Sequence, residues 1–104
     1  MGAAVRTRSG SIITGSLVEN VSLGLAMCAE RVALFATIAA GEEPVALVLA
    51  SPRTDGSITF PCGACLQVAL ELGDADLVVA ATTPEGDADI AVLGDLLPRG
   101  PKKT

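Results

Sequence analysis

The sequence predicts a single α/β domain, and three observations lead to this class. Two largely apolar runs of strand length, at 45–50 and 76–81, each follow a segment with helical periodicity. Two short β-prone runs precede them, separated by a Ser-Gly turn. The chain has 104 residues, which leaves no room for a second core. The predicted element order is therefore ββαβαβ within one domain.

The strands are predicted from apolar and β-prone runs. Residues Ala3–Thr7 and Ser11–Gly15 are expected to form a hairpin, because Ser9-Gly10 supplies a turn between them. The runs Val45–Ala50 and Asp76–Ala81 lack the polar alternation of a half-exposed strand. We therefore expect both to be strands that are covered on their two faces.

Two helices are predicted, and each begins at a cysteine. Apolar residues recur at helical spacing from Cys28 to about residue 40, and Gly41 suits the left-handed position that ends a helix. A second helix is expected from Cys62 to about residue 72, with Gly73 at its end. Both predicted helix N-termini therefore bring a thiol close to free backbone N–H groups.

Shorter features complete the assignment. A turn is expected at Arg53–Gly56, an extended piece at Ile58–Phe60, a last strand at Ile90–Leu93 and a helical turn at Gly94–Leu97. Pro98 stops that turn, so residues 1–98 are expected to form the domain and 99–104 a flexible tail.

The charge and the apolar runs exclude several classes of function. A formal net charge of −5 is unsuited to a nucleic-acid backbone, which requires clustered Lys and Arg. No apolar run reaches the length of a transmembrane helix, and the first residues do not resemble a signal peptide. We therefore expect a cytoplasmic protein that binds neither nucleic acid nor membrane.

Three cysteines, Cys28, Cys62 and Cys65, occur in a chain that has no histidine. An odd cysteine count does not suit a disulfide framework, whereas helix N-termini favour the thiolates that bind Zn²⁺. Because zinc takes four ligands, a site with three protein thiolates keeps a position for water unless a carboxylate or a neighbouring chain fills it. The alternatives are that the cysteines are small buried hydrophobes, or that Cys62 and Cys65 form a redox pair.

Glu30 and Arg31 lie directly after the first of these cysteines. Glu30 stands in the first helical turn, close enough to take a proton from a zinc-bound water and to pass it on during hydrolysis. The alternative is an ordinary first-turn glutamate that the helix dipole stabilises. Arg31 is suited to offset the excess negative charge of three thiolates around one zinc ion.

These residues occur within a longer pattern. Thr14-Gly15 and Val18-Glu19-Asn20 precede Cys28-Ala29-Glu30-Arg31, and Pro61-Cys62-Gly63-Ala64-Cys65 with Gln67 follows. The pattern, with the ending Leu96-Leu97-Pro98, resembles the small homotetrameric cytidine deaminases and contains the zinc signature of nucleobase deaminases.

The resemblance implies a fold, a cofactor and a set of residue roles. The fold would be the three-layer cytidine-deaminase-like fold, a mixed five-stranded sheet flanked by helices, with one Zn²⁺ per chain on the three cysteines. Glu30 would be the proton shuttle and Arg31 would support the thiolates. The N–H of Ala29 would hold the pyrimidine carbonyl, and Glu19 would bind the ribose. Neighbouring subunits of a tetramer would complete each site.

The sequence also departs from that family. Family members begin with a helix, whereas Met1–Ala4 already correspond to the first strand, so we expect one sheet face to be left open. Leu17, Leu23 and Leu66 replace an Asn, an aromatic residue and an Arg, and Arg99-Gly100 stand where an aromatic residue is usual. Groups that bind the sugar or stack on the base are therefore depleted, while the zinc motifs are intact.

Three functions follow from these observations. The first is hydrolytic deamination of cytidine, deoxycytidine or a related aminopyrimidine, with release of ammonia. The second is the same reaction on a modified pyrimidine such as blasticidin S. The third is a non-catalytic, zinc-stabilised subunit, for which Glu30 would have no use.

Overall fold

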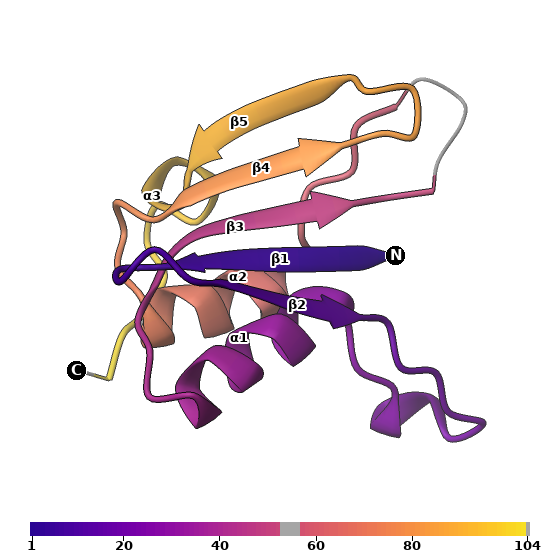
Figure 1. Ribbon diagram of the computed structural model, residues 1–104, viewed down its shortest axis with the longest axis horizontal. Coiled ribbons are helices and arrows are strands. Elements are labelled where there is room, and N and C mark those ends of the chain that lie inside the picture. Colours follow the sequence, from indigo (N-terminus) through magenta and orange to yellow (C-terminus); the bar gives the residue numbers. More distant parts are fainter. Residues whose placement is uncertain (53–56, 104) are drawn as a thin grey trace.

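The computed structural model describes residues 1–52 and 57–103, so the predicted turn at Arg53–Gly56 lies outside the described residues. One mixed sheet of five strands organises the chain (Figure 1). Its order is β2-β1-β3-β4-β5, and only β3 and β4 run parallel. The strands are β1 (Gly2–Thr7), β2 (Ile12–Ser16), β3 (Pro44–Ala50), β4 (Val78–Thr82) and β5 (Ala88–Val92).

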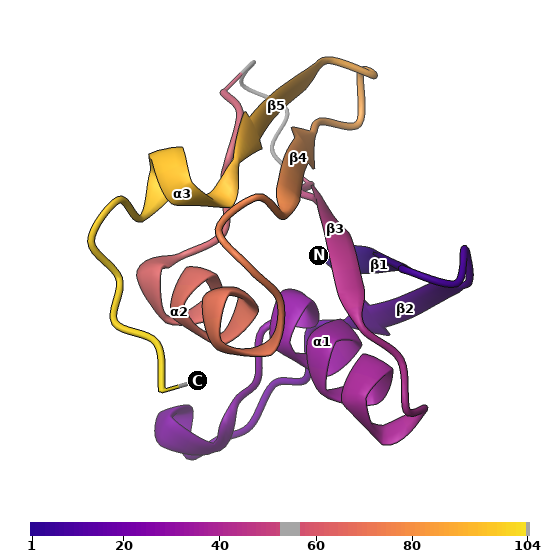
Figure 2. The same ribbon diagram turned by 90° about the vertical axis from the view of Figure 1, so that its left-hand side faces the viewer.

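The helices lie along one face of this sheet (Figure 2). They are α1 (Ala29–Ala39), α2 (Gly63–Leu72) and the short α3 (Leu93–Leu96), with a single 3-10 turn η1 (Leu23–Leu25) before α1. The α1 backbone packs on β1, β2 and β3, whereas α2 lies nearest to α1 and α3. Side chains from the helices and strands form one core: Ala3, Val5, Ala29, Ala33, Leu34, Leu47, Leu66, Ala69, Leu70, Leu77, Val79 and Leu93.

The other sheet face is open, which corrects the expectation that the two apolar strands are covered on both sides. In β3, Leu47 and Leu49 are buried toward the helices, while Val48 between them is exposed. In β4, Val79 is buried and Val78 is exposed. The fully apolar pattern misled the prediction, because it does not distinguish a covered face from an uncovered one.

Most element types agree with the prediction. The hairpin turn contains Gly10 at a φ of 94°, and Gly41 follows α1 at a φ of 72°, conformations that a Cβ atom disfavours. Strand boundaries shift by one or two residues, which is common where hydrogen bonding ends gradually. Residues Ile58–Phe60, predicted as a short extended piece, belong to no helix or sheet strand of the structure. The mixed five-stranded α/β class is confirmed.

Residues 99–103 run alongside α2 (Figure 2). Composition alone predicted a flexible tail, and these contacts were not foreseen. Among the helices of the described residues, none is long and apolar enough to cross a membrane.

Candidate metal centre and active site

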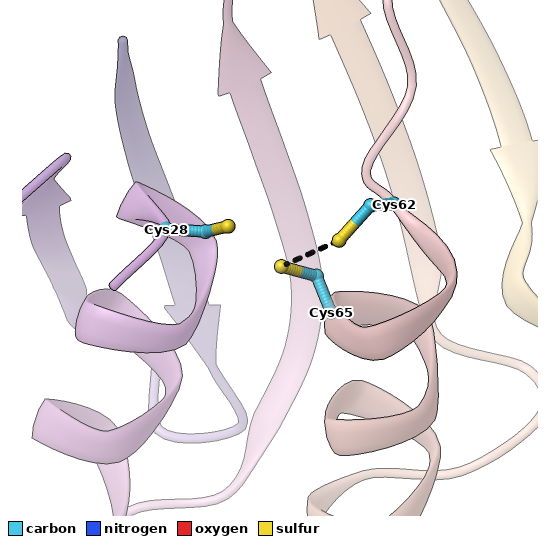
Figure 3. Close-up of side chains that lie close together, drawn as sticks. All are labelled: Cys28, Cys62 and Cys65. Carbon is cyan, nitrogen blue, oxygen red and sulfur yellow. Dashed lines mark hydrogen bonds between the residues drawn. The ribbon is translucent and has the colours of Figure 1, made fainter. Parts of the chain in front are cut away.

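Three thiols converge between the first turns of α1 and α2 (Figure 3). Cys28 is the residue before α1, Cys62 is the residue before α2, and Cys65 lies in the first turn of α2. Their sulfur atoms all lie within 4.8 Å of one another, and the Cys62 and Cys65 sulfurs are 3.6 Å apart. A tetrahedral zinc ion with Zn–S bonds of about 2.3 Å places its sulfur ligands about 3.8 Å apart. The three thiols therefore fit one zinc ion.

The local backbone explains why these sulfurs are free to bind a metal. Cys28 and Cys62 adopt extended conformations, and their carbonyl groups accept the first hydrogen bonds of the two helices, from Val32 at 3.1 Å and Leu66 at 3.0 Å. The Cys28 sulfur does not cap the N–H groups of α1, whereas the Cys62 sulfur lies beside the backbone N–H groups of Ala64 and Cys65 at the start of α2. Both thiols therefore lie at the positive end of a helix dipole, which favours thiolate.

Arg31 faces the thiols from the first turn of α1. Its Nη2 atom donates to the Cys28 sulfur at 3.3 Å. Hydrogen bonds to Cys28 and then to Cys65 raise the pKa of Arg31 above its ordinary value. Its Nε atom is buried and has no hydrogen-bond partner within the described part of the chain. The guanidinium therefore places a fixed positive charge beside ligands whose summed charge exceeds that of zinc.

The two thiols of α2 differ in acidity when no metal is present. Burial opposes ionisation of Cys62, but hydrogen bonds from the Cys65 backbone, the Cys65 side chain and the Ala64 backbone outweigh it and lower the Cys62 pKa. Burial, the hydrogen bond to Cys62 and the nearby charge of Glu30 raise the pKa of Cys65. Zinc binding to Cys65 must therefore displace a proton.

Glu30 is buried beside the thiols, with 4% of its surface exposed. Its charge acts on Cys65, which places the carboxylate near the metal centre. Among the described residues, the side chains close enough to share one ion are those of the three cysteines, and Glu30 does not belong to this group. The carboxylate is therefore positioned next to the coordination sphere rather than within it.

The remaining predicted site residues fall on two sides of this centre. Ala29 is fully buried in the first turn of α1, where the backbone N–H groups have no acceptor within the helix. Glu19 is exposed in the loop after β2. Val18 and Met27 form an isolated bridge, with hydrogen bonds of 2.9 and 2.8 Å, that brings this loop alongside the residue before Cys28. The structure thus joins Ala29 to the thiols and holds Glu19 on the adjoining loop.

Gly15 is a positioning residue that the sequence analysis assigned no role. A Cβ atom at this point of β2 would lie 2.5 Å from the Ala33 nitrogen and 2.7 Å from the Ala29 carbonyl oxygen. The missing side chain therefore lets β2 press against the first turns of α1, which carry Glu30. An isolated glycine within a strand indicates such a close approach and could have identified it.

Comparison with known proteins agrees with this geometry. The family model for the cytidine and deoxycytidylate deaminase zinc-binding region matches residues 1–81. A cytidine deaminase of Halalkalibacterium halodurans is 40% identical over 98 residues, which are 94% of this chain and 74% of the relative. A cytidine deaminase of Mycobacterium tuberculosis is also 40% identical over 98 residues, covering 94% and 69% of the two chains. The crystal structure of cytidine deaminase from Burkholderia pseudomallei superposes with a TM-score of 0.87 at 43% identity, over 95% of this chain and 79% of that one.

Proposed function

This chain belongs to the cytidine and deoxycytidylate deaminase family, and we propose that it acts on cytidine, deoxycytidine or a related aminopyrimidine. Members of this family bind zinc and deaminate by hydrolysis. One observation carries the proposal. Three thiols within 4.8 Å of one another stand beside the buried Glu30, in a chain that has no fourth cysteine and no histidine. Cys28, Cys62 and Cys65 would hold the ion, and its remaining position stays free for chemistry.

The protein's own groups account for the proton transfers. Zinc, when bound, supplies the positive charge that lets a water molecule lose a proton near neutral pH. Glu30 takes that proton as the water oxygen adds to the ring carbon that bears the amino group, and passes it to the ring nitrogen. A second proton moves through Glu30 to the amino group, the C–N bond breaks, and ammonia leaves. Water and the aminopyrimidine thus yield the oxo-pyrimidine and ammonia.

Substrate binding is assigned to the first turn of α1 and to the loop after β2. The Ala29 N–H would donate to the pyrimidine carbonyl, since the first N–H groups of a helix have no partner within it. Glu19 would accept from a ribose hydroxyl. Leu17 and Leu23 are exposed on the same loop, and they offer a sugar no hydrogen bond. This apolar loop supports a second candidate substrate, a modified pyrimidine such as blasticidin S.

A homotetramer that completes each site is a further part of the proposal. Val21, Leu23 and Leu25 are exposed by 102, 88 and 68% within the single chain. Such apolar exposure beside a metal centre is typical of a surface that another subunit covers. Light scattering on the zinc-loaded protein tests it, because a monomer at micromolar concentration would contradict the tetramer. We place the reaction in the cytoplasm, as a step of pyrimidine salvage, where thiol ligands stay reduced.

The test is an absorbance assay on cytidine, deoxycytidine, cytosine and blasticidin S with the wild type and with Glu30→Gln. We expect turnover of at least one nucleoside, one zinc per chain in both proteins, and a loss of at least about 100-fold in the variant, because general acid–base catalysis contributes this much. Glu85→Gln, at an exposed glutamate in the loop between β4 and β5, is the matched control and should keep full turnover.

The outcomes separate the candidates. Turnover of blasticidin S alone would assign the modified-pyrimidine substrate. A wild type that retains zinc and turns over none of the four compounds would favour the non-catalytic subunit. Turnover that survives in Glu30→Gln would contradict the proton-shuttle role alone.

A further inference from the structure

The C-terminal strap, residues Arg99–Lys103, is tied to α2 by three hydrogen bonds. The Gln67 side-chain amide donates to the Pro101 carbonyl at 2.6 Å. The Lys102 ammonium donates to the Gly73 carbonyl, and the Lys103 backbone N–H donates to the Glu71 carboxylate at 2.8 Å. These contacts extend from the second turn of α2 to the residue that follows the helix.

Close packing accompanies the hydrogen bonds. A Cβ atom on Gly100 would lie 2.7 Å from methyl carbons of both Leu70 and Leu97. The strap therefore passes α2 at a distance that only glycine allows without moving those side chains. Leu70 belongs to the main core, so the contact connects the strap with the interior.

Two features of α2 favour a restraining role for the strap. Its backbone lies nearest to α1 and α3, so the sheet constrains it less directly than it constrains α1. Its last turn also carries no basic residue, although cations stabilise the negative end of a helix dipole. Lys102 brings a positive charge to that end from elsewhere in the chain and hydrogen-bonds a carbonyl there.

We propose that the C-terminal strap holds α2 in the position that aligns Cys62 and Cys65 with Cys28, and that Lys102 is a positioning residue of the metal centre. The proposal departs from the flexible tail that composition predicts, and it rests on the proposed zinc ligands. A strap that fixes the far end of α2 restrains rotation of its near end, where both thiols lie. Zinc would then leave more slowly because its ligands cannot separate.

The experiment compares Lys102→Met with Lys103→Met. The two variants lose the same charge at neighbouring positions, but Lys103 contacts α2 through its backbone N–H, which the substitution keeps. Zinc release from purified protein to a coloured chelator is followed with time. We expect release about three- to tenfold faster in Lys102→Met, somewhat below the effect of residues that contact metal ligands directly. Lys103→Met should release zinc at the wild-type rate.

A second variant lacks residues 100–104, and circular dichroism verifies its fold. We expect the shortened chain to release zinc at least as fast as Lys102→Met. After cobalt substitution we also expect a weaker thiolate absorption band, which a general loss of stability in a folded protein would not change. The strap proposal would be overturned if the two lysine variants released zinc at equal rates. It would also be overturned if the shortened chain kept the wild-type release rate and the wild-type cobalt spectrum. A wild type that binds no zinc would instead remove the proposed ligand set, and the strap proposal with it.

Discussion

The first turns of α1 and α2 supply the same metal centre but are held in different ways. The start of α1 is buried: Ala29 is inaccessible, Glu30 nearly so, and β2 presses on the helix at Gly15. The start of α2 is more open, with Cys62, Gly63 and Ala64 exposed before the buried Cys65 and Leu66. On the proposed mechanism the two helices divide the roles: the sheet-anchored helix would orient the proton-transferring carboxylate, and the less constrained helix would supply two ligands.

That difference gives the metal a structural as well as a chemical part. A zinc ion between Cys28 and the two cysteines of α2 would link the sheet-anchored helix to the less constrained one. Zinc binding of this kind contributes directly to folding. We therefore expect the loss of zinc to loosen α2 before α1.

Removing one ligand from α2 should give the largest effect. Cys62→Ser and Cys65→Ser are each expected to abolish zinc retention, measured as metal content after gel filtration with a chelator. They should differ in the zinc-free state: only Cys65→Ser lowers stability, by about 1–2 kcal/mol, because it places a hydroxyl in a buried site. Urea unfolding measures this difference. A Cys62→Ser protein that keeps one zinc per chain would contradict the ligand assignment.

Breaking the anchor of α1 should give the next largest effect. Gly15→Ala is expected to destabilise the fold by about 3 kcal/mol, because the new methyl group meets backbone atoms of α1 that cannot rotate away. Thermal unfolding measures it. The matched control is Gly24→Ala, where no atom lies within 4 Å of the added carbon. Equal melting temperatures for the two variants would show that β2 does not anchor α1.

Removing the charge beside the thiols should give the smallest of these effects. Arg31→Met is expected to weaken zinc affinity about tenfold, since residues that support metal ligands typically contribute at this level. Stability of the zinc-free fold should change little, because the substitution also removes the buried Nε, which has no hydrogen-bond partner among the described residues. Competition with a chelator measures the affinity. Arg6→Met, at an exposed arginine of β1, is the control and should leave it unchanged.

The metal centre was the part of the molecule most open to prediction. The number and spacing of Cys28, Cys62 and Cys65 and their places at predicted helix starts indicate one metal centre, and the structure brings their sulfurs together at the starts of α1 and α2. Local chemistry sufficed because each motif combines a chain turn with its ligand. The roles of Glu19 and Ala29 stay predictions, since they depend on a bound substrate.

Contacts between distant segments could not be predicted in the same way. Gly15 and Gly100 are needed only because another segment passes close by, and nothing in their own neighbourhood specifies that segment. The apolar run of β3 likewise does not show whether one of its faces is covered or two, because the exposed Val48 is as apolar as its buried neighbours Leu47 and Leu49.

The sequence by itself determined the element types, the helix ends and the identity of the metal-binding residues. These follow from local periodicity, from turn chemistry and from the affinity of thiolates for zinc. Only the tertiary structure decided which sheet face is covered, how β2 anchors α1 and how Lys102 reaches the end of α2. Those features depend on packing between segments up to about 30 residues apart, and the energy of such packing belongs to neither segment alone.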